Sequence, residues 1–249
     1  MAQQVIGTTA YALLDKSWYG EFGGYQTLSR WMRDKLNVDD SGRIAGTAPY
    51  WRLAYYKDLH NQAFHAGFFG MQANLEPDYQ SSPKDHYRDL GVDASYQYLG
   101  TREHIFTLNT SYVDERTRLR YSYDNDAASR LHDDLKRFDI AASYTYKNTY
   151  GLTLGLFDIR GNKDDLRYNT GEADSGSVRG SPDSRGYTIQ LDWTPWGKED
   201  SWMAPYANLR FGVQYTGYTK FNGAKHNYDG YGRDASDNNT LFVFMWLSM

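Results

Sequence analysis

The chain lacks cysteine, carries only 6 prolines in 249 residues, and has no long hydrophobic run. Without cysteine it cannot form disulfides, thiolate metal sites, a thiol nucleophile or the Cys-x-x-Cys-His attachment of a c-type haem. No stretch approaches the roughly 18 consecutive apolar residues of a helical membrane span. The net charge of −4 argues against a nucleic-acid partner. The 6 histidines show no metal-ligand spacing, so neither a metal nor a cofactor is expected.

Aromatic residues are abundant in a chain that is otherwise polar. They make up 16% of the sequence, with 23 tyrosines and 7 tryptophans, while the mean hydropathy is only −0.76. A polar soluble domain rarely has so many aromatics. Porin-like barrels combine the two, because their lumen and loops are polar and aromatic girdles mark both membrane interfaces.

The last stretch, residues 239–249, is apolar from Leu241 to Leu247 and has no glycine, proline or charge. It is too short to cross a bilayer as a helix, which takes about 20 residues, but it suits a membrane strand of about 9–11. A strand in lipid must have all its backbone groups paired, so the sheet would have to close. The alternative is a buried strand of a soluble sandwich.

Apolar and polar residues alternate along most of the chain, as in half-buried strands. After residue 88, Leu90, Val92 and Ala94 share one face, and Asp89 and Asp93 share the other. Leu90, Val92, Ile140, Leu152, Leu154, Ile189, Leu191, Phe211 and Val213 are expected to face lipid. The pattern predicts eleven strands, at 5–14, 18–28, 50–57, 62–74, 89–98, 104–113, 138–146, 150–156, 187–193, 209–216 and 239–249.

Connection lengths favour a membrane barrel over a sandwich. Short turns at 15–17, 58–61, 99–103 and 147–149 alternate with long polar loops at 29–48, 75–86, 114–136, 158–185 and 219–238. Short periplasmic turns and long extracellular loops are typical of outer-membrane barrels. We therefore predict an all-β fold, a transmembrane antiparallel β-barrel of about 12 strands forming a single domain over residues 1–249. The segment SRWMRDKL at 29–36 suits a short helix.

The odd strand count needs an explanation, because bacterial single-chain barrels have an even number of strands. Either a further strand lies near residues 119–123, or the chain is a truncated fragment of a longer barrel. The stretches AQQVIGTTAYALLDKSWYGEF, TAPYWRLAYYKD, GSPDSRGY and YTKFNGAKHNYDGYGRDASDNNTLF resemble a known family. They are similar to the C-terminal barrel portion of proteobacterial outer-membrane proteins of the cytochrome c/porin fusion type.

That resemblance covers nearly the whole chain and implies the barrel. In the family a haem-binding segment and further strands precede this portion. Here the haem-binding segment is absent, because the chain has no Cys-x-x-Cys-His. What carries over from the resemblance is therefore the barrel, either as a passive pore or as a sheath for a haem-bearing redox partner.

Charged side chains on the polar strand faces are the candidate pore lining: Glu21, Arg52, His65, Asp89, Asp93, Asp139, Asp192 and Arg210. Rings of charge bias permeation toward the opposite sign, so five acids against two arginines predict a small, weakly cation-selective pore. The alternative is a solvated wall with structural ion pairs. The Asp-rich loops at 124–134 and 229–237 lack the Asp-x-Asp-x-Asp-Gly order of a calcium site and suggest solvated loops.

We therefore expect a porin-like passive pore for ions or small solutes in the bacterial outer membrane, or the redox sheath, and not an enzyme. The expected partners are outer-membrane lipid and the barrel-assembly machinery. One alternative is a barrel hydrolase or lipid-modifying enzyme using His65, His86, His104 or Asp85 at the rim, although no spacing supports it. The other is a soluble β-sandwich binding module.

Overall fold

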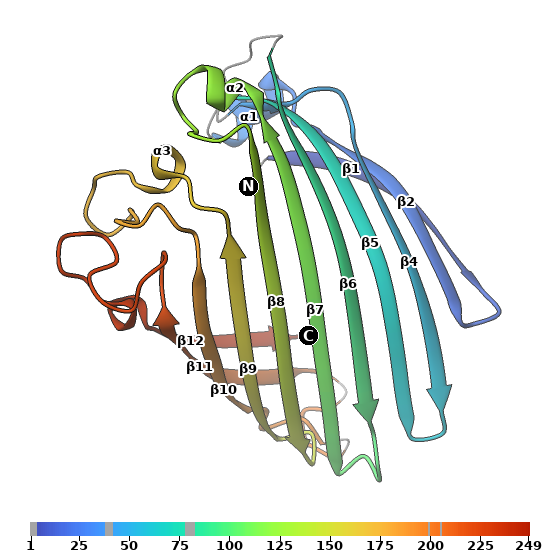
Figure 1. Cartoon of the computed structure of the whole chain (residues 1–249). Coiled ribbons are helices and arrows are strands. Elements are labelled where there is room, and N and C mark those ends of the chain that lie inside the picture. Colours follow the sequence, from blue (N-terminus) through green and yellow to red (C-terminus); the bar gives the residue numbers. More distant parts are fainter. Residues whose placement is uncertain (1–3, 38–41, 78–82, 199, 205) are drawn as a thin grey trace.

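The computed structural model describes residues 4–37, 42–77, 83–198, 200–204 and 206–249, and it consists of one antiparallel sheet of 12 strands (Figure 1). The long strands are β1 (Val5–Leu14), β2 (Trp18–Thr27), β4 (Ala48–Leu59), β5 (Gln62–Glu76), β6 (Asp85–Tyr98), β7 (His104–Leu119), β8 (His132–Tyr146), β9 (Tyr150–Gly161), β10 (Ser184–Trp193), β11 (Asn208–Lys220) and β12 (Thr240–Ser248). The short β3 (Arg43–Ile44) pairs with β5 beside this path. The helices are α1 (Arg30–Leu36), α2 (Arg120–Asp124), α3 (Asp165–Tyr168) and the 3-10 turn η1 (Ala235–Asn238).

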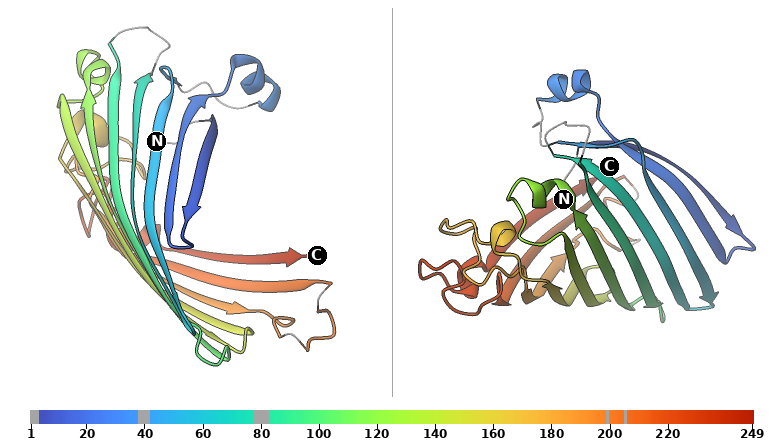
Figure 2. Two further views of the ribbon diagram at one scale, coloured as in Figure 1. Left: turned by 90° about the vertical axis from the view of Figure 1, so that its right-hand side faces the viewer. Right: turned by 45° about the horizontal axis from the view of Figure 1, so that its top comes forward.

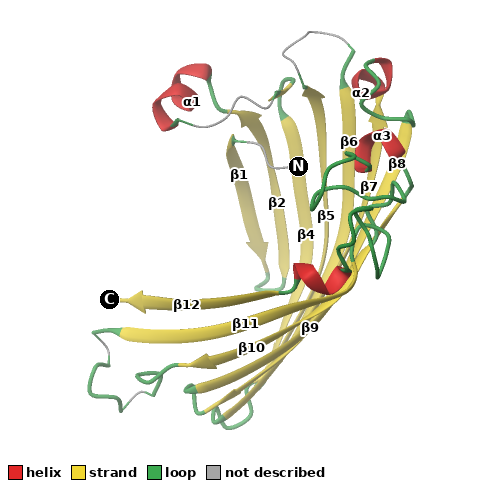
Figure 3. Cartoon of the chain, turned by 90° about the vertical axis from the view of Figure 1, so that its left-hand side faces the viewer, coloured by secondary structure: helices red, strands yellow, loops and turns green. Residues whose placement is uncertain are grey.

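The predicted fold class is confirmed: all-β, with one antiparallel sheet of 12 strands. Consecutive long strands pair from β1 to β12, so each is joined to the next by a hairpin or loop. The sheet is strongly curved and twisted (Figures 2 and 3). Within the described ranges no pairing links β12 back to β1, and β12 has β11 as its sole strand neighbour, so the expected closure is not seen.

The two faces of the sheet differ in chemistry, as the alternation predicted. The expected lipid-facing residues share the outer face, where Leu154 is 50% exposed, Leu191 58% and Val213 43%. Among the described residues no second layer covers this face, which excludes a two-sheet sandwich (Figure 3). A small apolar cluster of Ile44, Ala48 and Leu75 lies instead against the opposite face, where β3 meets β5.

Strand limits on the turn side agree with prediction, whereas strands on the loop side run further than expected. β7 continues to Leu119 and β8 begins at His132, in register through the pairs Arg116–Asp134 and Arg118–His132. Charges on these strand ends had suggested loop. Charged residues are compatible with strand here, because the backbone hydrogen bonds between β7 and β8 continue beyond the part of the strands that has an apolar face.

The prediction of a further strand near residues 119–123 is wrong. Leu119 ends β7, and α2 follows directly at Arg120. The buried Asp85 carboxylate accepts a hydrogen bond from the Ser122 amide at 3.1 Å and holds this helix to the start of β6. The twelfth strand is β3, in the loop whose helical segment, α1, was predicted. No helix in the described ranges is long and apolar enough to cross a membrane.

The long loops gather at one end of the sheet and the short turns at the other (Figure 1). These loops are built on buried carboxylates and are not simply solvated. Asp229 accepts hydrogen bonds from the backbone amides of Asp174, Tyr231 and Arg233 at 2.9–3.2 Å. Beside it the fully buried Tyr228 donates its hydroxyl to the Asp174 carbonyl at 3.1 Å.

A second buried carboxylate, Asp164, joins two of the loops. It accepts hydrogen bonds from the amides of Ser129, Arg130 and Arg167 at 2.9–3.1 Å. Burial alone would raise the pKa of Asp164, but the hydrogen bonds led by those from Ser129 outweigh it and lower that pKa. The loop end of the sheet therefore carries an ordered cap.

Candidate functional site

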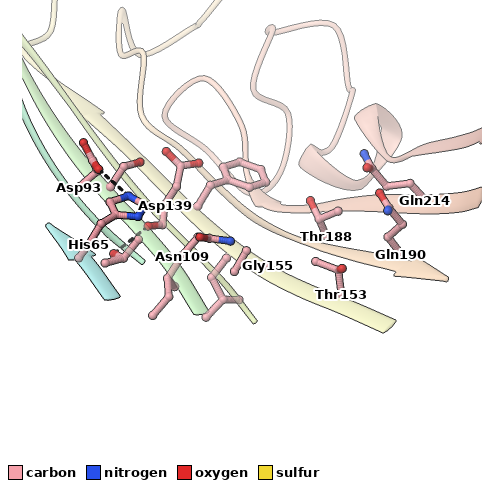
Figure 4. Close-up of a pocket in the computed structure, with 16 residues that line it drawn as sticks. His65, Asp93, Asn109, Asp139, Thr153, Gly155, Thr188, Gln190 and Gln214 are labelled. Carbon is pink, nitrogen blue, oxygen red and sulfur yellow. Dashed lines mark hydrogen bonds and ion pairs between the residues drawn. The ribbon is translucent and has the colours of Figure 1, made fainter. Parts of the chain in front are cut away.

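The polar face of the sheet encloses a cavity of about 440 Å³ that reaches from β5 to β11 (Figure 4). Because its lining crosses seven strands, it occupies the concave side. One row of cross-strand partners crosses its floor through His65, Asn109, Ala141, Gly155 and Thr188, with Ser95 between the first two in the row but outside the lining. Small side chains at Ala141 and Gly155 leave this space open, and the polar ones give a water-compatible wall.

The most tightly connected group in this region is a charge cluster from three neighbouring strands. Arg52 on β4 binds both carboxylate oxygens of Asp93 on β6, at 2.5 and 2.8 Å. His65, on the intervening β5, places Nε2 3.2 Å from Asp93 Oδ1 (Figure 4). The Arg52 and Asp93 side chains are only 18% and 16% exposed, so this is a largely desolvated bidentate pair.

Two further acids that the sequence predicted as pore lining, Asp139 and Asp192, each form an ion pair with an arginine. Asp139 accepts hydrogen bonds from Arg137 on the same strand, at 2.7 and 3.0 Å. Asp192 accepts one from Arg210 Nε at 2.8 Å, across the β10–β11 pair. Predicted residues that looked like free lumen charges are therefore mostly neutralised locally.

The remaining two acids, like Asp192, do not line the cavity. Glu21 is the cross-strand partner of Arg52 and accepts a hydrogen bond from the Tyr19 hydroxyl at 3.1 Å. Asp89 faces a smaller, mainly apolar cavity at the loop end, beside its cross-strand partner Glu115. Its Oδ1 is buried without a hydrogen-bond partner in the described structure. Asp89 and Asp93 therefore border different cavities, although they share one face of β6.

Sequence reasoning missed several residues of the site. Arg137 and Glu115 were overlooked because β7 and β8 were ended too early on the loop side. The uncharged Asn109, Gln190 and Gln214 also line the cavity. Their positions on the polar strand faces were the signal that would have found them. Within the described ranges no group of three or more His, Asp or Glu side chains is arranged to hold a metal ion.

Comparison with known proteins gives little beyond the fold. No protein-family model matches the chain, and no curated protein does. Among solved structures it is similar to OmpT (in-vitro folded), an outer membrane protein of Vibrio cholerae, with 10% sequence identity and a TM-score of 0.46. The alignment covers 96% of this chain and 64% of that one, so this chain spans less than two thirds of its length.

The expectation that the chain is not an enzyme is corrected. It depended on the absence of any spacing that would bring an acid and a base together, yet the sheet places His65 Nε2 3.2 Å from Asp93. One fold can host transport and catalysis alike. Neither the site nor the fold therefore excludes catalysis.

Proposed function

We propose that this chain is the wall of a bacterial outer-membrane β-barrel and that its concave face lines a passive pore for ions and small solutes. The observation that carries the proposal is the contrast between the faces. A broad apolar face lies uncovered, and large exposed apolar surfaces mark interaction with a membrane or another protein. The opposite face of the same strands borders a cavity of about 440 Å³, and most of the residues that line it are polar, among them His65, Asp93 and Asp139.

Aromatic residues near the turn-side strand ends support the membrane assignment. Trp18 packs on Tyr55 with ring centroids 4.9 Å apart, and Trp193 stacks on Phe211 at 5.6 Å. Both tryptophans are about half exposed or more, at 60% and 48%. Amphipathic rings at one level of the outer face suit a membrane interface. Outer-membrane lipid and the barrel-assembly machinery are the corresponding partners.

The proposal places one requirement on β1 and β12. Sheet edges are not tolerated in hydrocarbon, so both must be paired in the membrane. The short β3 lies beside the main sheet, which therefore has eleven antiparallel strands from β1 to β12 in the described residues. Because this number is odd, β1 and β12 run in the same direction. Fully antiparallel closure therefore takes an odd number of further strands, which also gives the even total of bacterial barrels.

Local pairing of the lumen charges makes the pore weakly selective. Asp93, Asp139 and Asp192 each bind an arginine, whereas Glu21, Asp89 and its cross-strand partner Glu115 have no ion-pair contact among the described residues. A residual negative potential attracts cations and is screened over about 10 Å at 0.1 M salt.

Recordings from the full chain folded into a planar bilayer test the proposal. Discrete conductance steps are expected, with a reversal potential under a salt gradient that has the cation-selective sign and shrinks as salt rises. A clear anion preference would contradict the charge assignment. Absence of conductance from protein that shows heat-modifiable mobility would contradict the pore and favour the sheath for a redox partner.

A further inference from the structure

A cavity with a cationic wall lies at the loop end of β10 and β11. Its volume is about 500 Å³, and it is lined by Arg179, Arg185, Lys220, Lys225 and His226, with Thr219, Gly223 and Ala224. No acidic side chain is among these lining residues. The cavity is separate from the concave-face cavity, with which it shares no residue.

The basic side chains of this cavity are only partly paired with carboxylates. Three of them have carboxylate partners that do not line it: Arg185 with Asp158 at 2.8 Å, Lys220 with Asp183 at 2.7 Å, and His226 with Asp234 at 2.7 Å. Arg179 and Lys225 have no ion-pair partner in the described part of the chain, and both are exposed. The cavity thus holds two positive charges, those of Arg179 and Lys225, with no carboxylate in direct contact among the described residues.

The position of Arg185 connects the cavity to the outer face. Along β10, Arg185 shares its face with Ile189 and Leu191, which are exposed apolar residues. The register shifts at Arg185 against β11 but is unbroken against β9, where Arg185 is opposite Asp158 and Ile189 is opposite Leu154. Arg185 therefore lies on the outer face, beyond its apolar part on the loop side. The cavity therefore opens where the apolar surface ends on the loop side.

More cations stand at the same level on the neighbouring strands. By the same alternation, the outer face at the loop end also carries Arg88, Arg116, Lys136 and Arg160. Arg116 and Arg160 bind Asp114 and Asp158, whereas Arg88 and Lys136 have no ion-pair partner among the described residues. An excess of positive charge therefore follows the boundary of the apolar face over several strands.

We propose that the cavity of Arg179, Arg185, Lys220, Lys225 and His226 binds the phosphate of a lipid headgroup in the leaflet on the loop side of the membrane. A lipid whose chains lie along the apolar outer face brings its phosphate to this level. Guanidinium groups match phosphate geometry through paired N–H donors, and an ammonium adds a point charge. The inference rests on the proposed membrane location but not on the pore.

The test uses the full chain refolded in detergent micelles and read by native mass spectrometry. Phosphatidic acid is the probe, and diacylglycerol, which has the same chains but no phosphate, is the reference. Each Lys or Arg near an anionic surface strengthens binding about fivefold. The double variant Arg179→Gln/Lys225→Gln is therefore expected to bind phosphatidic acid about 25-fold more weakly, with diacylglycerol binding unchanged. The matched control is Lys16→Gln/Arg102→Gln, which removes one lysine and one arginine from exposed turns at the opposite end.

An equal loss in the control variant, or no loss in the double variant, would overturn the site. Displacement of phosphatidic acid by millimolar inorganic phosphate would also overturn it, because it would identify a soluble-anion site. Channel recordings of the double variant separate this proposal from the pore. If the double variant conducts as the wild type does but binds phosphatidic acid more weakly, the lipid site is supported. If the wild-type chain does not conduct, the pore proposal fails, but lipid binding that depends on Arg179 and Lys225 still supports the lipid site.

Discussion

The outer and concave faces of the sheet use the same strands for opposite environments. On β9, Leu152, Leu154 and Leu156 project outward and are exposed, whereas Thr153 on the concave face shares a hydrogen bond with Ser143 at 2.9 Å. Polar partners would not stabilise the apolar band of the outer face, because it is expected to contact lipid. The concave face holds several of its charges in pairs, such as Arg52 with Asp93 and Arg210 with Asp192. One residue of shift along a strand exchanges these environments.

The largest effect is expected from placing the same charge on each face. Leu154→Lys puts an ammonium near the middle of the apolar band and should lower the free energy of unfolding from a bilayer by about 2–4 kcal/mol. Thr188→Lys places it on the concave face of the neighbouring strand, in the row that contains Gly155, and should change that free energy far less. Denaturant titration in lipid vesicles measures both. Equal losses would mean that the faces are wrongly assigned.

A smaller effect separates ion pairs on the two faces. Arg52→Ala leaves the largely desolvated Asp93 with His65 alone and should cost about 1–3 kcal/mol, the penalty of an unsatisfied buried group. Arg116→Ala removes a cation that is 60% exposed from Asp114 on the outer rim and should cost less than about 1 kcal/mol. The same vesicle titration applies. A costlier loss at Arg116 would contradict the burial of the Arg52–Asp93 pair.

Period-2 alternation was sufficient to predict the strands and their faces, because one face of each strand is apolar over several residues. It failed where both faces are charged, at the loop ends of β7 and β8. There the backbone pairing continues between residues such as Arg116 and Asp134, although the side chains resemble those of a loop.

The pairing of charges was beyond prediction from one sequence. Arg52 and Asp93 are 41 residues apart and meet only because β5 brings β4 and β6 close enough for their long side chains to touch.

The neighbours of the terminal strand were also beyond prediction from the sequence. Its apolar character predicted neighbours on both sides, but β12 has only β11 in the described structure, and its concave-side Phe242 and Phe244 stack on each other at 5.5 Å.

The natural absence of cysteine allows each face to be labelled at a single site. Gly155→Cys adds a side chain on the cavity floor, where the nearest atom to its Cβ would be 3.6 Å away, an ordinary contact. A water-soluble, charged methanethiosulfonate reagent should modify it and partly block the current. Leu154→Cys, one residue away, should resist the reagent in lipid. Reaction at Leu154→Cys with no change at Gly155→Cys would invert the assignment of the faces.

The smallest expected effect is on selectivity. Asp93→Asn removes one negative charge from the concave face while leaving the Arg52 guanidinium, so the local charge of that pair changes from neutral to positive. The reversal potential under a salt gradient should shift toward anions, by less at high salt because screening shortens the reach of the field. The control is Asp114→Asn, which frees Arg116 in the same way but on the outer rim. Because that charge does not face the permeation path, its reversal potential should match the wild type. An equal shift in both variants would mean that selectivity comes from the rim and not from the concave face.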